Sequence, residues 1–500
     1  MQSEQQEYNR PLHELLDAIG VRECVNGQSG YIKLITADSR QVVPGAMFVA
    51  VRGVEADGHK FIPAAIKAGA AAIVAEELPE ELPEGVAGIK VSDSRMALGY
   101  LASRFYGDPS EELTLVGVTG TNGKTTIATL LYELARMCGK KAGLLSTVAN
   151  IVDTDSVPAD HTTPDPVMLN RLLRRMVDAG CTFAAMEVSS HAADQHRIAG
   201  LTFAGGIFTN LTRDHLDYHK TFEAYLKAKK SFFDMLPPTA FALSNADDRN
   251  GAVMMQNTPA GRKAYYSVRD MADFHVRLIE DRIDGMLLDF DGSQVETLFA
   301  GRFNASNLAA VYGAGILLGI PRADLLRYMS ALRPVAGRFQ HFTSAEGVTA
   351  IVDYAHTPDA LVNVLDTINE VAPENARIIT VCGAGGNRDH GKRPLMAKAA
   401  AERSHVLILT SDNPRDEDPD AIIDDMLAGL DTAQKENCTA ITDRRKAIEH
   451  AANIARPGDI ILIAGKGHET YQIIGKETIH FDDRQEICRA LNIDTTNHKL

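Results

Sequence analysis

Apolar runs of strand length alternate with helix-like segments along most of this 500-residue chain. Such alternation predicts βαβ units, in which parallel strands form a sheet and helices cover its faces. Each apolar run ends in a polar or glycine-rich tip, and ligands of open α/β sheets bind at such carboxyl ends of strands. We therefore expect an α/β protein with its functional groups at these tips. The runs are LTLVGVTG, AGLLSTV, FAAMEVSS and GGIFTNL in mid-chain, then TAIVDYAH, ARIITVCGAG, HVLILTSD and DIILIAGKG.

Two breaks divide this alternation into three predicted domains. A chain of this length corresponds to about three domains of roughly 150 residues each. The polar segment YGDPSEE ends the first region, and RPVAGRFQHF separates the two groups of apolar runs. We predict an N-terminal α/β domain over 1–108, a central parallel-sheet domain over 109–335 and a Rossmann-like C-terminal domain over 336–500. The strand tips of the last two domains should face a shared cleft.

Composition and charge exclude several classes of protein. A net charge of −15 argues against a general nucleic-acid binder, since phosphate backbones are bound by basic surfaces. The polar N-terminal segment lacks the apolar core of a signal peptide, and no run of about 18 apolar residues predicts a membrane-spanning helix. The six cysteines include no C-x-x-C pair, which favours reduced thiols. We expect a cytoplasmic protein that binds no nucleic acid and does not span a membrane.

The stretch GVTGTNGKTT, residues 117–126, lies between an apolar strand and a helical segment. The usual phosphate-loop pattern, G-x-x-x-x-G-K-[ST], would need a glycine where Val118 stands. Backbone N–H groups at a strand-to-helix turn nevertheless point at an anion, and the helix dipole reinforces them. Lys124 would reach terminal phosphates, and the Thr125 hydroxyl would suit Mg²⁺. An ordinary glycine turn that opens a helix is the alternative.

Further motifs follow in order across most of the chain, and together they resemble the Mur ligase family. The ATP loop of that family has the shorter form G-T-x-G-K-[ST], which explains the missing glycine. Folylpolyglutamate synthetase shares the loop but differs, like the later muramyl ligase, where DYAHTPD stands. Within the family the chain is most similar to ligases that add diaminopimelate. The motifs are DSR at 38–40, HTTPDP at 161–166, MEVSSHAADQHR at 186–197, TNLTRDHLDYH at 209–219, AKKSFF at 228–233, GRFNASN at 301–307, DYAHTPD at 353–359, GNRDHGKRP at 386–394, DNPR at 412–415 and GKGHE at 465–469.

The resemblance implies an ATP-dependent ligase of peptidoglycan precursor synthesis. It would join meso-diaminopimelate to the D-glutamate of UDP-N-acetylmuramoyl-L-alanyl-D-glutamate, through an acyl-phosphate that the incoming amine attacks. The D-glutamate carboxylate and the γ-phosphate of ATP are both anions, so the first step needs two Mg²⁺ ions and Lys124 to neutralise oxygens. Three domains bridged by one substrate should close around it and exclude water. We expect the enzyme to act as a monomer.

The resemblance assigns catalytic roles to Lys124, Glu187, His215 and Lys229. Glu187 and His215 each follow an apolar strand, and they match residues that hold a second Mg²⁺ near the γ-phosphate. Zinc is the alternative for a histidine-rich stretch, but no cysteine or histidine pair on a helix supports it. His219 follows His215 by four residues, yet the residues between them read as a turn.

Lys229 is also assigned a covalent modification. Family members carry a carbamate, formed from CO₂ and a neutral amine, on the lysine four residues before a phenylalanine. Lys229 and Phe233 have that spacing here, with Lys230 as the adjacent competitor. A carbamate is an anion able to bind Mg²⁺, which a plain lysine cannot do. A lysine on a helix is otherwise usually a solvated surface residue. The expected metal ligands are Thr125, Glu187, His215 and Lys229.

Family positions also indicate two nucleotide sites. Taken alone, TTP and DSR read as simple turns, and their assignment rests on the whole set of motifs. Hydroxyls and an arginine suit the carboxylates of the UDP-linked dipeptide. The residues expected to bind ATP are Gly120, Thr121, Asn122, Gly123, Lys124, Thr125, Thr126, Asn307, Arg338, Asp353 and His356. Those expected to bind the UDP-linked substrate are Ser39, with Arg40 beside it, Thr162, Thr163, Ser189, Gln195 and Arg197.

The DNPR run is expected to select the amine that is added. Diaminopimelate and lysine differ by one carboxylate at the far end of the side chain. Arg415 follows a strand tip and a proline, which fixes the local backbone, and its guanidinium would grip that carboxylate through two parallel hydrogen bonds. Asp412 and Asn413 would take the neighbouring ammonium. The alternative is an Asx turn with a surface arginine. The residues expected at this site are Arg388, Asp412, Asn413, Pro414, Arg415, Gly465 and Glu469.

Two other functions are compatible with parts of this pattern. A lysine-adding ligase would have the same fold, but such relatives carry a different run in place of DNPR. A regulatory P-loop ATPase would hydrolyse ATP without any amino-acid acceptor.

Overall fold

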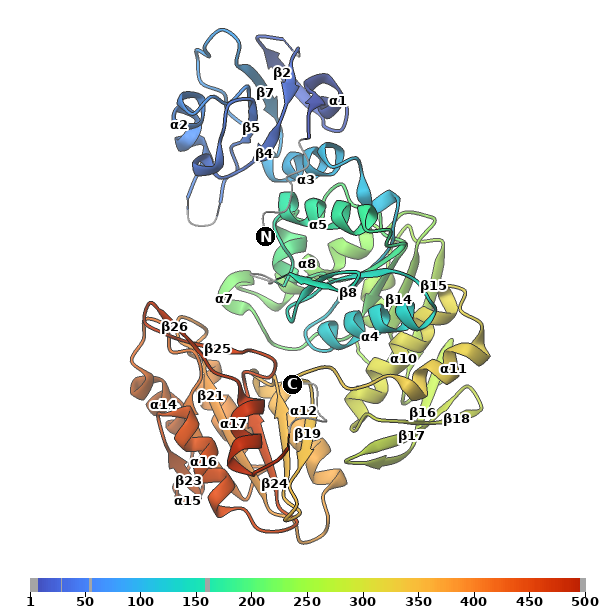
Figure 1. The fold of residues 1–500 in the computed structure, drawn as a ribbon, viewed down its shortest axis with the longest axis vertical. Coiled ribbons are helices and arrows are strands. Elements are labelled where there is room, and N and C mark those ends of the chain that lie inside the picture. The colour runs from blue at the N-terminus through green and yellow to red at the C-terminus, as the bar shows by residue number, and fades with distance from the viewer. Residues whose placement is uncertain (1–7, 28, 54–55, 158–161, 495–500) are drawn as a thin grey trace.

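The computed structural model describes residues 8–27, 29–53, 56–157 and 162–494. Residues 1–7 of the polar N-terminal segment and His161 of the HTTPDP motif lie outside the described residues. Figure 1 shows three bodies that follow one another along the long axis in the order of the chain. Their main sheets have five, eleven and six strands. The predicted three-domain α/β fold is confirmed, and the boundaries at 108 and 335 stay a prediction.

The first body is a sheet with the strand order β2-β7-β6-β5-β4. Its last four strands are parallel and buried on both faces, as in other α/β sheets, while β2 runs antiparallel to β7. Helices α1 and α3 pack on one face, and α2 packs on the other. The bounds are α1 Leu12–Leu16, β2 Val21–Val25, β4 Leu34–Thr36, β5 Ala46–Val49, α2 Ile62–Lys67, β6 Ala72–Ala75, β7 Ala87–Val91 and α3 Ser94–Phe105, and a small ribbon pairs β1 Arg10–Pro11 with β3 Tyr31–Ile32.

The second body is an eleven-stranded sheet in the order β11-β10-β9-β12-β8-β13-β14-β15-β16-β17-β18. Strands β9, β12, β8, β13, β14 and β15 form its parallel centre. The strand bounds are β8 Thr114–Thr119, β9 Ala142–Leu145, β10 Asn150–Val152, β11 Asp155–Val157, β12 Phe183–Glu187, β13 Gly205–Phe208, β14 Phe241–Asn245, β15 Arg262–Ser267, β16 Phe274–Arg282, β17 Gly285–Phe290 and β18 Ser293–Thr297.

The sequence predicted a parallel central sheet, and the antiparallel strands at both edges correct that prediction. Strands β10 and β11 form a hairpin at one edge, and β16, β17 and β18 form a meander at the other. Asp291 and Gly292 connect β17 to β18, with φ angles of 47° and 88°. Positive φ at both turn residues matches the twist of a two-residue hairpin, so an Asp-Gly pair favours an antiparallel connection here.

Helices cover both faces of the central sheet and bury two separate cores. Residues of α4, α10 and α11 belong to one core, and residues of α5 and α8 belong to the other. The helix bounds are α4 Lys124–Met137, α5 Pro166–Asp178, α6 Ser190–Asp194, α7 Leu216–His219, α8 Phe222–Asp234, α9 Gly251–Met255, α10 Arg302–Leu317 and α11 Arg322–Ala331.

The third body is a sheet in the order β19-β20-β24-β21-β22-β23, parallel except for β19. Helices α12, α13 and α14 cover one face, and α16 and α17 cover the other. The bounds are β19 Gln340–Thr343, β20 Thr349–Asp353, α12 Pro358–Val371, β21 Ile378–Ala384, α13 Lys392–Ala401, β22 Val406–Ser411, α14 Pro419–Leu427, α15 Thr432–Glu436, β23 Cys438–Ala440, α16 Arg444–Ile454, β24 Ile460–Ala464, α17 Asp483–Ala490 and the hairpin β25 Tyr471–Ile474 with β26 Glu477–His480.

Two motifs that read as turns in the sequence begin helices. Asp165 accepts hydrogen bonds from two backbone N–H groups of α5, and Pro166 is the first residue of that helix. Thr357 caps α12 in the same way, with Pro358 at its first position. A capping oxygen followed by proline is a favoured helix start, because proline has no N–H to leave unpaired there. In the part of the chain that the structure describes, no helix is long and apolar enough to cross a membrane.

Candidate active site

The glycine loop joins β8 to α4, which begins at Lys124. Gly120 and Gly123 have φ angles of 149° and 87°, a backbone conformation that other residues rarely adopt. A Cβ on Gly120 would lie 1.8 Å from the hydroxyl of Thr209, and one on Gly123 would lie 2.5 Å from the Asn307 amide oxygen. Both glycines are therefore required by backbone conformation and by close approach.

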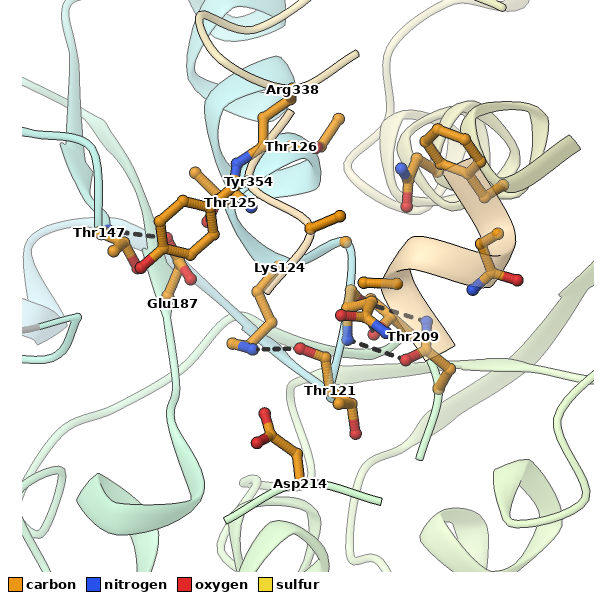
Figure 2. Close-up of a pocket in the computed structure, with 18 of the residues that line it drawn as sticks. Thr121, Lys124, Thr125, Thr126, Thr147, Glu187, Thr209, Asp214, Arg338 and Tyr354 are labelled. Atoms are coloured by element: carbon orange, nitrogen blue, oxygen red, sulfur yellow. Dashed lines mark hydrogen bonds between the residues drawn. The ribbon is translucent and has the colours of Figure 1, made fainter. Parts of the chain in front are cut away.

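Lys124 folds back over this loop, as Figure 2 shows. Its ammonium donates hydrogen bonds to the carbonyl oxygens of Gly120 at 2.9 Å and Thr121 at 2.7 Å. Burial lowers the pKa of Lys124, whereas the nearby carboxylates of Glu187 and Asp214 raise it. The ammonium thus lies where an anion held by the loop would meet it.

A cavity of about 290 Å³ opens beside the loop and is lined by two domains. All the residues expected to bind ATP line it except Gly120, which contributes the carbonyl described above. Glu187, His215, Lys229, Thr162 and Ser189 line the same cavity. Groups predicted from distant motifs are therefore brought together at the facing strand tips of the central and C-terminal sheets.

Arg338 connects the two sides of this cavity. Its guanidinium donates to the Thr125 hydroxyl at 3.0 Å and lies 4.3 Å from the centre of the Tyr354 ring. Burial raises the pKa of Asp353, while Arg338 opposes that shift. Among the described residues, the buried Nε of Arg338 has no hydrogen-bond partner. The side chain therefore keeps a donor for a bound group.

Glu187 is the last residue of β12, and only 1% of it is exposed. Its carboxylate accepts a hydrogen bond from the backbone N–H of Thr147 at 2.8 Å (Figure 2). The Thr147 hydroxyl donates to Thr162 at 3.0 Å, and the Thr163 hydroxyl donates to the Glu187 carbonyl at 2.8 Å. A second bond joins Thr163 to Ser189. The hydroxyls of Thr147, Thr162, Thr163 and Ser189 thus form a hydrogen-bonded network around Glu187.

The structure corrects the predicted surroundings of His215. The residue does not follow a strand directly, because β13 ends at Phe208, and the expected turn after it is the one-turn helix α7. His215 has a φ angle of 53° just before α7, and its ring lies 4.9 Å from that of His191. Burial lowers the pKa of His215 to about 3, although Asp214 opposes the shift. A neutral imidazole can accept a hydrogen bond or bind a metal.

Lys229 and Lys230 occupy contrasting positions on α8. Only 1% of Lys229 is exposed, and its amine donates to the Gly120 carbonyl at 2.7 Å. Burial and the neighbouring Lys124 hold the pKa of Lys229 well below its usual range. Lys230 instead pairs with Asp234 at 2.6 Å. The surface alternative considered for a helical lysine thus describes Lys230, while Lys229 lies against the loop.

The donor set can be compared with what Mg²⁺ requires. Among the described residues, no three His, Cys, Asp or Glu side chains are placed to hold a metal ion. The cavity does combine the Glu187 carboxylate with the Thr125 hydroxyl and the His215 imidazole. Mg²⁺ usually binds one or two protein carboxylates and takes its other ligands from phosphates and water. The residues therefore fit Mg²⁺ that enters with a nucleotide.

The residues expected to bind the UDP-linked substrate are only partly assembled. Gln195 and Arg197 line a second cavity of about 100 Å³ between the first two domains. Arg197 donates to the Gln195 amide oxygen at 2.8 Å and to the Thr163 carbonyl at 2.9 Å, which links this cavity to the hydroxyl network. Ser39 lines neither cavity, and Arg40 beside it is paired with Asp38 at 2.8 Å.

The residues predicted to select the amine gather at the carboxyl ends of β21, β22 and β24. Arg415 donates from Nη1 to the Gly386 carbonyl at 2.9 Å. A Cβ on Gly385 would lie 3.1 Å from that nitrogen and 3.8 Å from Cγ of Arg388, so both arginines flank this glycine. Burial and the charge of Arg415 lower the pKa of Arg388. Among the described residues, Nε and Nη2 of Arg415 have no hydrogen-bond partner.

The backbone at Arg415 differs from the sequence interpretation. Its φ angle is 54°, so the proline before it does not set its conformation. Two backbone bonds do: the Arg415 N–H donates to Ile473 at 3.1 Å, and the Gly475 N–H donates to Arg415 at 2.7 Å. The hairpin β25–β26 therefore fixes this residue. The Pro414 carbonyl packs against Gly386. A Cβ on Gly386 would lie only 1.8 Å from that carbonyl oxygen.

Sequence reasoning missed a buried lysine beneath the DNPR run. Lys466 is fully buried, and its ammonium donates to the Asn413 amide oxygen at 3.2 Å and to Glu469 at 2.9 Å. It also lies 4.0 Å from Asp412, and a Cβ on Gly465 would lie 2.7 Å from that carboxylate. Asp412 and Asn413, which were expected to take a substrate ammonium, thus already face an internal one. The position of Lys466 within the GKGHE motif could have indicated its role from the sequence.

Asp214 is a second residue that the sequence interpretation missed. It lines the main cavity beside His215 and faces the C-terminal domain. Burial opposes its ionisation, yet His215, His356 and Lys392 together hold its pKa below the usual value. Its place in the RDH run, next to a predicted metal ligand, could have indicated it.

Comparison with known proteins gives one consistent result. Three family models match: "Mur ligase family, catalytic domain" over 31–106, "Mur ligase middle domain" over 118–315, and "Mur ligase, glutamate ligase domain" over 337–467. A relative from Bacteroides fragilis, named UDP-N-acetylmuramoyl-L-alanyl-D-glutamate–2,6-diaminopimelate ligase, is 57% identical and covers 96% of this chain and 99% of its own. A relative of the same name from Parabacteroides distasonis is 58% identical, with 95% and 98% covered. A solved structure of that name has a TM-score of 0.67 at 33% identity and covers 97% of this chain and 99% of its own.

Proposed function

Because the chain belongs to the Mur ligase family, we propose that it is the ATP-dependent ligase that adds 2,6-diaminopimelate to UDP-N-acetylmuramoyl-L-alanyl-D-glutamate. The product is a precursor of peptidoglycan. We take the added amine to be the meso form and the acceptor to be the D-glutamate carboxylate. Relatives above 55% identity that are matched over nearly their whole length support the same activity for the whole chain.

The cavity shared by two domains is the observation on which this function mainly rests. One wall is the glycine loop with Lys124, and the opposite wall is the strand tip with Asp353 and His356. A ligase must bring a nucleotide and an acceptor carboxylate together out of water, since an acyl-phosphate is readily hydrolysed. A cavity between two domains can close around both substrates.

In the first step the D-glutamate carboxylate attacks the γ-phosphorus, and ADP leaves. The carboxylate becomes an acyl-phosphate, so the protein has little covalent chemistry to perform. Lys124 would move from the loop carbonyls to the transferring phosphoryl oxygens, and Arg338 would add a second cation across the cavity. Thr125, Glu187, His215 and a carbamylated Lys229 would hold Mg²⁺, which when bound neutralises phosphate oxygens.

A carbamate on Lys229 is the proposed modification. Burial lowers the pKa of Lys229 and so favours the neutral amine, which has the lone pair that attacks the carbon of CO₂. Loss of one proton then yields an anionic carbamate. Lys124 also contacts the Gly120 carbonyl, so its ammonium would stabilise the new charge. The burial of Lys229 against the loop supports this modification at Lys229 and not at Lys230.

In the second step the amine of diaminopimelate attacks the acyl carbon and phosphate leaves. Arg388 and Arg415 would bind the far carboxylate, and a paired guanidinium–carboxylate contact suits the free fork of Arg415. The acidic cluster of Asp412 and Glu469 would attract the ammonium beside that carboxylate. Lysine would leave both arginines without an anion, which explains the proposed selectivity.

We further propose that the enzyme acts as a monomer in the cytoplasm. All six cysteines are free, as reduced thiols would be in that compartment. Native mass spectrometry of the purified protein tests the monomer, and a stable dimer would contradict it.

An ATP-turnover assay tests the proposed function. Purified enzyme should release phosphate from ATP only when both the UDP-linked dipeptide and meso-diaminopimelate are present, with one phosphate per tripeptide formed. Rapid turnover without either substrate would indicate a regulatory ATPase and would contradict the proposal.

A further inference from the structure

Arg393 is a fully buried arginine outside the residues assigned to the site. It lies on α13, and only 1% of it is exposed. Its Nη2 donates to both carboxylate oxygens of Glu417, at 2.9 and 2.8 Å, and its Nη1 donates to Asp425 at 2.8 Å. A bidentate contact of this kind fixes the orientation of both partners. A buried charge with such partners is costly to disturb, because removing one leaves the other unpaired.

Glu417 belongs to the loop that carries Arg415, and it also contacts the loop that carries Arg388. The backbone N–H of Asn387 donates to Glu417, and the Asn387 side chain donates to Asp416 at 2.9 Å. Arg393 adds a bond to the Gly385 carbonyl at 3.4 Å. The two loops, residues 385–390 and 412–417, therefore meet at the Arg393–Glu417 pair.

This junction matters because the two loops present like charges. Arg388 and Arg415 flank Gly385, and each guanidinium disfavours the other when no anion lies between them. Attractive contacts between the two loops must offset this repulsion if Arg388 and Arg415 are to stay close enough to bind one carboxylate. The Arg393–Glu417 pair contributes to this, together with the Gly386 N–H bond to the Asn413 carbonyl at 2.9 Å and the contact of His390 with Glu417 at 3.8 Å.

We propose that Arg393, acting through Glu417, is a positioning residue that sets the spacing of Arg388 and Arg415 and so the selectivity for an amine with a far carboxylate. The inference rests on the proposed function. Arg393 is not a catalytic residue, since its two terminal nitrogens donate to protein groups and the side chain does not line the main cavity.

Steady-state kinetics of Arg393→Met and Glu417→Gln test this role, with meso-diaminopimelate and L-lysine as alternative amines. We expect the KM for meso-diaminopimelate to rise on the order of 100-fold, the effect of a displacement of about 1 Å. The KM values for ATP and the UDP-linked dipeptide should stay unchanged, and so should the slow reaction with lysine, which has no far carboxylate. The preference for meso-diaminopimelate would then fall by the same factor.

A matched control and a double variant separate positioning from general stability. Arg403 pairs with Asp366 at 2.8 Å in the same domain, away from both loops, so Arg403→Met should leave every KM unchanged. The double variant Arg393→Met with Glu417→Gln should be no worse than Arg393→Met, because that single variant already breaks the Arg393–Glu417 pair. If Arg393→Met does not fold, Glu417→Gln alone decides the question.

Two results would overturn the inference in distinguishable ways. Variants that keep the wild-type preference, or that raise all three KM values together, would show that the pair only stabilises the domain. A wild-type enzyme without any preference for meso-diaminopimelate over lysine would instead contradict the proposed function.

Discussion

Basic side chains around the glycine loop (residues 117–126) and around the DNPR run (residues 412–415) have different hydrogen-bond partners. At the loop, the side-chain nitrogens of Lys124 and Lys229 donate to backbone carbonyls, and an incoming phosphate can replace these partners of Lys124. Around the DNPR run, Lys466 and Arg393 are already paired with carboxylates inside the protein. The first region is therefore arranged to change partners during the reaction, and the second is arranged to keep its shape. Under the proposed function, the reaction would depend mainly on the first region and selectivity for the amine on the second.

Removing Lys124 should have the largest effect and is the sharpest test of the loop. Lys124→Ala should abolish acyl-phosphate formation, because a charge clamp on a transferring phosphoryl group contributes roughly 3–4 kcal/mol or more. Binding of diaminopimelate should be unaffected. Phosphate release and calorimetric binding measure the two effects.

The control for this variant is Lys141→Ala, which removes an exposed lysine 3.8 Å from Asp153. Near-normal phosphate release by Lys124→Ala would mean that the phosphates bind elsewhere, and the contrast between the two regions would fail.

Lys229 tests whether the loop region depends on a modification. Lys229→Ala should be nearly inactive and partly rescued by acetate or formate, which can supply the missing carboxylate oxygens. Lys230→Ala is the matched control and should be mild, since Lys230 pairs only with surface groups. Intact-mass spectrometry under added CO₂ should detect the carbamate on wild-type protein only. Equal losses at both positions would contradict the assignment.

Arg415→Ala should damage the second region while sparing the first. We expect a loss of more than about 100-fold in kcat/KM for meso-diaminopimelate, because its far carboxylate would lose a charged hydrogen-bonding partner. Affinity for ATP should not change, since Arg415 does not line the main cavity. The variant need not gain activity with lysine. A parallel loss of ATP affinity in an isothermal titration would show that the regions are not separate.

Substitution of His468 gives the smallest expected effect. It tests whether burial and Arg338, at the first region, keep this GKGHE histidine neutral in the folded protein. Burial and then Arg338 lower the pKa of His468 to about 3, against an unfolded value near 6.5. The unfolded chain therefore binds more protons between these values, so stability falls as pH falls below 6.5.

Between pH 7 and 5 the wild type should thus lose about 1–2 kcal/mol more free energy of unfolding than His468→Asn. Urea unfolding at the two pH values measures this difference. Equal losses in both proteins would show that His468 is not held neutral in the fold.

Much of the first region was predictable from sequence, and less of the second. Gly120 to Thr126 are consecutive, so their backbone conformation follows from local residue types, and ten of the expected ATP residues line one cavity. Arg393 pairs with Glu417 and Asp425, which are distant in sequence, and the burial of Lys466 is not visible in the sequence, so neither residue was assigned a role. The left-handed Arg415 depends on the β25–β26 hairpin, which the sequence interpretation did not include.

A competition experiment tests the central claim most directly. Wild-type enzyme is given ATP, the UDP-linked dipeptide and equal concentrations of meso-diaminopimelate and L-lysine, and the products are separated by mass. We predict that the diaminopimelate tripeptide exceeds the lysine tripeptide by more than about 100-fold, because lysine has no carboxylate to pair with Arg388 and Arg415. Equal amounts of the two tripeptides would contradict it.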